Sequence, residues 1–210
     1  VQKHHIAKLS DIASPTGEEE TFIVPDTIEG WADALGTLLS SYFTQNQPFP
    51  EFANKRVLFD YSLIRAKGKP ISSGMGRAPG PEPLKRSLNL IRELLERCVA
   101  DGQSRLRSVD AYDILMHASD AVLSGGVRRS ATICLFSPDD ELMANAKTGN
   151  WFHENPQRAR SNNSAILLRD KTTPEQFSKL LQSVKEFGEP GFVWTDDLEM
   201  TFNPCAEIGL

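Results

Sequence analysis

The order of helix and strand patterns along the chain constrains its fold most. Two segments, 84–100 and about 109–123, carry apolar residues at helical spacing and follow one another without a strand between them. Later in the chain, an apolar strand pattern at 163–168 is followed by a helix pattern at 174–187 and a short strand pattern at 191–194. Helices in succession, followed by strand, helix and strand, indicate an α/β body that carries a helical insertion.

The remaining segments supply further elements around this plan. The N-terminal 28 residues have no clear period and are expected to be irregular. Beyond them the patterns predict a helix from about 29 to 42 with Asp26 or Thr27 as its cap, strands at 56–61 and 127–136, and short helical pieces near 141–146. At 210 residues, the chain is long enough for one sizeable core.

The charge and composition exclude several classes of protein. A net charge of −5 argues against a nonspecific grip on nucleic acid or on an anionic membrane surface, and no run approaches the roughly eighteen apolar residues of a membrane-spanning helix. Three widely spaced cysteines are too few for a disulfide framework or a zinc knuckle, so no metal site is expected and a reducing, cytoplasmic setting fits best. The N-terminus lacks both an initiator Met and the apolar core of a secretion signal, and we expect both ends to be cuts through a longer polypeptide.

The C-terminal stretch has the pattern that most suggests chemistry. Asn203, Cys205 and Glu207 stand at alternate positions, and in an extended segment such positions project from one face. Pro204 favours extended geometry at Asn203. A hydrogen-bond former, a sulfur and a carboxylate on one face suit chemistry at a carbon that bears a hydroxyl. The alternative is a half-buried strand end with three polar groups, and the spacing does not separate the two.

Two loops have the composition that phosphate binding needs. Residues 124–130 combine glycines, which permit close backbone approach, with arginines, whose planar guanidinium groups suit phosphates or base edges. Residues 65–74 combine three cations with small hydroxyl residues, which suits a triphosphate. A plain surface turn and an exposed basic loop are the alternatives. Residues 161–164 could line a pocket, although a turn is the default for such a cluster, and Cys98 and Cys134 are expected in the core.

Taken together and in order, these motifs resemble those of ribonucleotide reductase. The form that they resemble most is the adenosylcobalamin-dependent class II enzyme, in its monomeric ribonucleoside-triphosphate version. The likeness spans nearly the whole chain, and residues 29–32 and 161–164 also fit it. Its four main segments are FDYSLIRAKG at 59–68, GGVRRSA at 125–131, GEPG at 188–191 and NPCAEI at 203–208.

The resemblance implies a catalytic role for each of the three C-terminal polar residues. Cys205 would become a thiyl radical at the tip of a finger loop and remove the 3′ hydrogen of the ribose. Glu207 would take the proton of the 3′-hydroxyl, and Asn203 would hydrogen-bond the sugar hydroxyls. A shielded, neutral thiol suits this chemistry better than a thiolate.

The resemblance also implies two nucleotide-binding loops. One passes between the specificity effector and the substrate, and the other binds the phosphates of the effector. The substrate-binding residues would be Gly126, Arg128 and Ser130. The effector-binding residues, all cations, would be Arg65, Lys67 and Lys69.

For the fold, the resemblance implies part of a ten-stranded α/β barrel that is incomplete in this chain. Residues 1–28 would form an irregular N-terminal segment, 29–123 a mainly helical specificity-effector region, and 124–210 a partial barrel that ends in the finger loop. Neither Cys98 nor Cys134 matches the redox-active cysteine pair of the family. The chain alone is therefore expected to be inactive without the remainder of the same polypeptide.

The implied activity is the reduction of ribonucleoside triphosphates to 2′-deoxyribonucleotides. The implied cofactor is adenosylcobalamin, because no side chain here generates a radical. The implied partners are the ribonucleoside triphosphate substrate, a deoxynucleotide effector and a thioredoxin-like reductant, with no membrane and no direct nucleic acid contact. Two alternatives stay open: the large subunit of a class I enzyme, whose radical comes from a second protein, and a non-catalytic nucleotide-binding regulatory module.

Overall fold

The structure, a computed structural model, describes residues 10–71, 76–122, 131–206 and 208–209. The chain divides into two compact units. Within the described ranges, the N-terminal unit comprises residues 10–71, 76–107 and 117–122, and the C-terminal unit comprises residues 108–116, 131–206 and 208–209. The boundary between the units falls within one helix, α4 (Ser108–Ala121).

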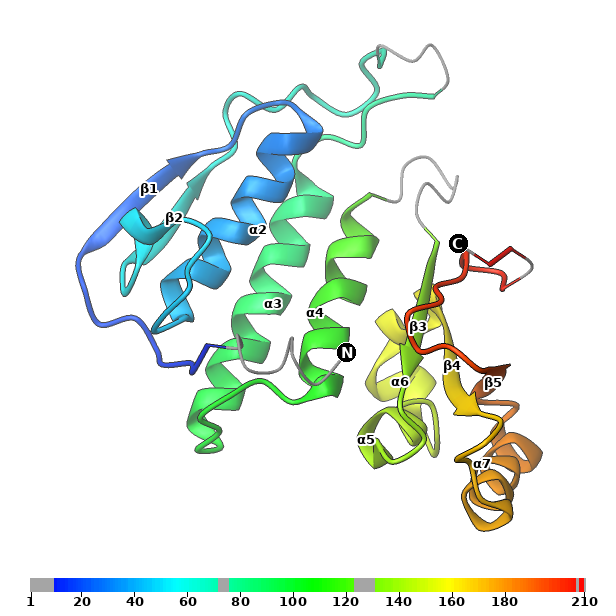
Figure 1. Cartoon of the computed structure of the whole chain (residues 1–210). Coiled ribbons are helices and arrows are strands. Elements are labelled where there is room, and N and C mark those ends of the chain that lie inside the picture. Colours follow the sequence, from blue (N-terminus) through cyan, green and yellow to red (C-terminus); the bar gives the residue numbers. More distant parts are fainter. Residues whose placement is uncertain (1–9, 72–75, 123–130, 207, 210) are drawn as a thin grey trace. The chain divides into compact units, whose positions relative to one another are not determined.

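The N-terminal unit is built from two strands and two long helices (Figure 1). Its elements are β1 (Glu19–Ile23), α2 (Ile28–Tyr42), the 3-10 turn η1 (Pro50–Phe52), β2 (Arg56–Asp60) and α3 (Glu82–Ala100). β1 and β2 pair in parallel, with Glu19 opposite Arg56, and α2 connects them. The prediction that residues 1–28 are irregular is therefore wrong at β1. The hydrogen-bond partners of β1 lie in β2, far along the chain, so no local period reveals this strand.

The two helices of this unit follow the sequence patterns closely. The predicted cap of α2 at Thr27 is confirmed, since the Thr27 side chain accepts a hydrogen bond of 2.9 Å from the Gly30 amide. α3 begins two residues before its predicted start. Cys98 is 2% exposed on its buried stripe, which confirms the core thiol expected there. The residues that α3 buries are Leu84, Ser87, Leu88, Ile91, Leu94, Leu95 and Cys98.

The C-terminal unit is a three-stranded parallel sheet with helices (Figure 1). The strands β3 (Thr132–Phe136), β4 (Ser161–Leu168) and β5 (Gly191–Thr195) lie side by side in the order β3-β4-β5. α5 (Glu141–Ala144), α6 (Trp151–Glu154) and the 3-10 turn η2 (Pro156–Arg160) lie between β3 and β4, and α7 (Pro174–Phe187) joins β4 to β5. The predicted strand, helix and strand at the end of this order are confirmed. The strand predicted at 127–136 is confirmed from Thr132, and residues 127–130 lie outside the described ranges.

One face of the sheet is buried against helices. Ala165 and Leu167 of β4 are fully buried on this face. The core that contains them also includes Val109, Tyr112, Met116, Phe136, Met143, Ala146 and Leu180. Because successive side chains of a strand alternate, Asn162 and Ser164 point to the opposite face. Two parallel sheets with connecting helices make the chain an α/β protein, as predicted. None of the helices in the described ranges combines the length and the apolar character that a membrane crossing requires.

Candidate functional site

Cys205 lies on a closed turn, not on an extended segment. Phe202 and Gly209 form an antiparallel bridge. Between them, the Asn203 amide donates to the Ile208 carbonyl at 3.1 Å and the Ala206 amide donates to the Asn203 carbonyl at 2.8 Å. The Ile208 amide donates to Oδ1 of Asn203 at 2.9 Å, and Ala206 has a left-handed backbone with φ of 65°. The extended geometry expected for this segment is therefore wrong at residues 203–206, because the Asn203 side chain acts as an acceptor that closes a turn.

The closed turn determines which atoms of the predicted catalytic residues are accessible. Asn203 is half-buried and Cys205 is exposed, while Glu207 lies outside the described residues. Oδ1 of Asn203 accepts one hydrogen bond within the turn, which leaves its second lone pair and the N–H groups of Nδ2 for a ligand. Asn203 and Cys205 both lie on this turn, and their roles stay predictions.

The turn is attached to β4 of the sheet. Nδ2 of Asn162 donates to the carbonyl oxygen of Pro204 at 3.3 Å. Asn162 belongs to the cluster at 161–164, for which a turn was the default expectation. That expectation is wrong, because these four residues begin β4, which starts two residues before the strand predicted at 163–168.

A buried polar network lies at the start of β4. Oγ of Ser161 donates to Oδ1 of Asn163 at 2.6 Å, and the Tyr112 hydroxyl shares its single proton between the same Oγ, at 2.6 Å, and the Arg158 carbonyl, at 3.3 Å. Burial raises the pKa of Tyr112 to about 12, which keeps this donor protonated. Asn163 is 1% exposed, and its Nδ2 has no hydrogen-bond partner among the described residues. The network fixes the backbone on both sides of Asn162.

A buried lysine extends this network to the GEPG motif. The Lys147 side chain is 4% exposed, and its Nζ donates to the Ser161 carbonyl at 2.6 Å and to Oε1 of Glu189 at 2.8 Å. The same Nζ lies 5.5 Å from the centroid of the Trp151 ring. A buried ammonium needs such an ion pair and hydrogen bonds to offset its lost hydration. Sequence reasoning missed Lys147, because nothing in its local sequence distinguishes it from a surface lysine.

The cations predicted to bind effector phosphates lie together on one loop of the N-terminal unit. The Gly68 amide donates to the Ala78 carbonyl at 2.9 Å, and the Ala78 amide donates to the Lys69 carbonyl at 2.8 Å. The side chains of Arg65, Lys67 and Lys69 are exposed on this loop. Arg65 also donates from Nε to Oδ2 of Asp26 at 2.5 Å. The predicted substrate-binding residues, Gly126, Arg128 and Ser130, lie outside the described residues.

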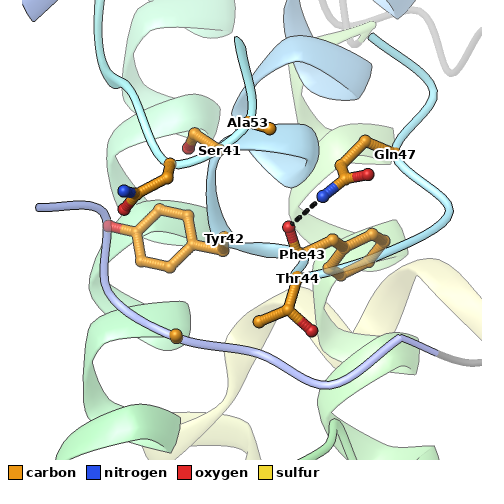
Figure 2. A pocket seen from close by; sticks show the side chains of 8 residues that line it. Ser41, Tyr42, Phe43, Thr44, Gln47 and Ala53 are labelled. Atoms are coloured by element: carbon orange, nitrogen blue, oxygen red, sulfur yellow. Dashed lines mark hydrogen bonds between the residues drawn. The ribbon is translucent and has the colours of Figure 1, made fainter. Parts of the chain in front are cut away.

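A separate pocket of about 280 Å³ lies at the C-terminal end of α2 (Figure 2). Its lining residues are Ala13, Ser41, Tyr42, Phe43, Thr44, Gln47, Ala53 and Asn54. Figure 2 shows Gln47 turned toward the Phe43 carbonyl, to which its Nε2 donates at 2.7 Å. None of these lining residues carries a charge, so the pocket does not match a phosphate group. No residue predicted from the sequence to bind a ligand lines it.

The three thiols are expected to differ in reactivity toward iodoacetamide. Burial raises the pKa of the Cys134 thiol to about 11, and Cys98 is buried, whereas Cys205 is exposed. In the native chain at about pH 8, we expect Cys205 to be alkylated at least about tenfold faster than Cys98 and Cys134, because the thiolate must form and be accessible. Peptide mapping by mass spectrometry measures the three rates. Unfolding in urea should remove the difference, and equal rates in the native chain would contradict the burial of the two core thiols.

Comparisons with known proteins agree with the resemblance seen in the sequence. Residues 5–95 match the family model "B12-dependent ribonucleotide reductase, insertion domain". A probable adenosylcobalamin-dependent ribonucleoside-triphosphate reductase of Dictyostelium discoideum is 37% identical over 183 residues, which are 85% of this chain and 22% of the relative. The adenosylcobalamin-dependent ribonucleoside-triphosphate reductase of Lactobacillus delbrueckii subsp. bulgaricus is 34% identical over 89% of this chain and 26% of the relative.

A solved structure supports the same family. The crystal structure of a B12-dependent (class II) ribonucleotide reductase matches 85% of this chain with a TM-score of 0.70 and 31% sequence identity. Over most of its length, the chain is similar to part of the class II ribonucleotide reductases. It spans 23% of that solved chain, so it corresponds to about a quarter of a class II reductase. The match to the insertion domain of class II reductases includes the loop of Arg65, Lys67 and Lys69 and ends within α3.

Proposed function

We propose that this chain is part of a polypeptide that reduces ribonucleoside triphosphates to 2′-deoxyribonucleotides by a thiyl-radical mechanism. The observation that carries the proposal is the exposed Cys205 on a hydrogen-bonded turn attached to a parallel sheet, next to Asn203. The relatives, which are named as adenosylcobalamin-dependent ribonucleoside-triphosphate reductases, support the substrate class and the cofactor. The sheet β3-β4-β5 would be part of a ten-stranded α/β barrel whose other strands belong to the remainder of the polypeptide.

The proposed roles divide the reaction among three residues. The Cys205 sulfur radical takes the hydrogen atom from C3′ of the ribose and forms an S–H bond, which leaves a radical on C3′. Glu207 accepts the proton of the 3′-hydroxyl, and the 2′-hydroxyl leaves as water with a proton from a cysteine pair elsewhere in the polypeptide. Nδ2 of Asn203 donates to a sugar hydroxyl and holds the ribose at the sulfur. The same cysteine pair supplies the two electrons of the reduction, and a thioredoxin-like reductant restores it. The Cys205 thiol then returns its hydrogen atom to C3′, which forms the sulfur radical again.

Cys205 is exposed in this chain, which departs from the shielded thiol expected from the sequence, so the cofactor and the remainder of the polypeptide would cover its sulfur. A thiol becomes a radical only if an oxidising group can approach its sulfur, and the Cys205 side chain is accessible on its turn. Adenosylcobalamin, when bound, supplies an organic radical for this purpose. Within this chain, Cys205 would face the cofactor, and Asn203 and the closed turn would hold the sulfur in place.

The cationic loops would bind the two nucleotides. Arg65, Lys67 and Lys69 are exposed on one loop, which suits the phosphates of a deoxynucleotide effector. Gly126, Arg128 and Ser130 would bind the substrate and transmit the identity of the effector. Residues 29–123 would then form the specificity-effector region, after an N-terminal segment at 1–28, and residues 124–210 the catalytic part. A cytoplasmic setting suits both nucleotides and free thiols.

Omission of the cofactor tests the proposal against the class I alternative. In the complete protein, with effector and reductant present, formation of deoxyribonucleotide should fall to background when adenosylcobalamin is left out. Readdition of adenosylcobalamin should restore it, while cyanocobalamin, which lacks the organic ligand, should not. Turnover that is unchanged without any cobalamin would contradict the class II assignment.

A further inference from the structure

The four residues that begin β4 alternate between the two faces of the sheet. Ser161 and Asn163 face the helices, where they hydrogen-bond each other and Tyr112. Asn162, between them, is exposed and points to the opposite face. The buried network thus holds the backbone on both sides of Asn162 and limits its movement.

Asn162 contacts the peptide group that leads directly into Cys205. Its Nδ2 donates at 3.3 Å to the carbonyl of Pro204, and this carbonyl belongs to the peptide bond between Pro204 and Cys205. The turn is closed by three hydrogen bonds that involve Asn203, so it behaves as one unit. A hydrogen bond to the Pro204 carbonyl therefore restricts the direction of the Cys205 side chain.

We propose that Asn162 is a positioning residue that orients the Cys205 sulfur for hydrogen-atom transfer. The inference rests on the proposed function of Cys205. Asn162 would act through the Pro204 peptide group, to which it donates its hydrogen bond. Hydrogen-atom transfer needs a short, aligned approach of sulfur to C3′, and misplacement of a reacting group by about 1 Å can cost about 100-fold in rate.

Two substitutions in the complete protein test this role. Asn162→Asp keeps the shape of the side chain but replaces the donor with an oxygen that repels the Pro204 carbonyl. Asn162→Leu also removes the donor but adds no charge. An effect that both variants show is therefore due to the lost hydrogen bond and not to the added charge. Asn145→Asp is the matched control, because the exposed Asn145 also donates from Nδ2 to a backbone carbonyl, that of Glu141, at 2.8 Å.

Both Asn162 variants should lower kcat by about 10- to 100-fold and leave the KM for the nucleotide and the thermal unfolding temperature unchanged. Hydrogen exchange should become faster in the peptide that spans Phe202 to Gly209 and stay unchanged in β3. The Asn145→Asp control should match the parent protein in kcat and in exchange of this peptide. A merely structural role of Asn162 would instead lower the unfolding temperature and affect kcat and KM together.

The test separates this inference from the proposed function. Normal kcat and normal exchange in both Asn162 variants would overturn the positioning role, even if Cys205→Ser is inactive. An active Cys205→Ser variant would overturn the proposed function instead. Faster exchange of the turn together with an unchanged kcat would also overturn the positioning role, because the position of the turn would then not limit the reaction.

Discussion

Replacing Cys205 with serine in the complete protein is expected to abolish deoxyribonucleotide formation, with a loss of at least about 10⁴-fold in kcat. The substitution changes one atom of an exposed side chain, so the turn and its hydrogen bonds through Asn203 should persist. An O–H bond is much stronger than an S–H bond, and a serine hydroxyl therefore does not supply the radical that removes the 3′ hydrogen. Product formation under saturating substrate, effector and adenosylcobalamin measures the effect.

Cys134→Ser is the matched control for this prediction. Cys134 is partly buried in β3, packs against the core of the C-terminal unit and has no role in the proposed reaction. Its replacement should lower stability slightly, because a hydroxyl enters an apolar site, and should leave kcat nearly unchanged. If the Cys205→Ser variant binds deoxynucleotide effector normally but no variant or parent turns over, the non-catalytic regulatory module is the better description. Substantial turnover by Cys205→Ser would reject the radical role.

Elements with a strong local signal were predicted well from the sequence. α7 has the boundaries that its pattern gave, since Pro174 opens it and Gly188, with φ of 74°, ends it. β1 was missed because it is short, mostly exposed and stabilised by its pairing with β2. Strand formation of this kind depends on a partner that is distant in sequence, and local propensity contains no information about it.

In the candidate site, too, residues close together in sequence were predicted, and residues far apart in sequence were missed. Asn203 and Cys205 are neighbours in sequence, so their spacing revealed them, although the shape inferred from it was wrong. The alternation rule assumes an extended backbone, and the Asn203 side chain offers a competing hydrogen bond that closes a turn. Lys147 and Glu189 are 42 residues apart, so their ion pair becomes visible only when β4 and β5 are placed side by side.

Removal of the ion pair between Asp113 and Arg158 is expected to lower the stability of the C-terminal unit strongly. Arg158 donates from Nε to Oδ1 of Asp113 at 2.8 Å and from Nη2 to Oδ2 at 2.6 Å, which is a bidentate arrangement. The side chains of Arg158 and Asp113 are 13% and 7% exposed. Gln157 also donates to Oδ1 at 3.0 Å, and Nη1 of Arg158 donates to the Ala146 carbonyl at 2.6 Å. The pair therefore ties α4 and η2 to the segment after α5.

Asp113→Ala should reduce the free energy of opening of the C-terminal unit by about 3–5 kcal/mol, because it leaves a buried guanidinium without its counter-charge. Native-state hydrogen exchange of the β4 amides measures this free energy without requiring that the whole chain unfold in one step. Arg158→Ala should be similarly costly, since the carboxylate of Asp113 is then left unpaired.

The double variant Asp113→Ala/Arg158→Ala decides the cause of that loss. If the uncompensated charge dominates, the double variant should lose much less than the sum of the two single variants, because neither charge is then left alone. Glu141→Ala is the control, since its ion pair with Lys179 is exposed in the same unit and solvent screens it, so its removal should leave the exchange of β4 unchanged. Additive losses in the double variant would instead attribute the effect to lost packing of the two side chains, and the ion pair would then contribute little to the stability of the sheet.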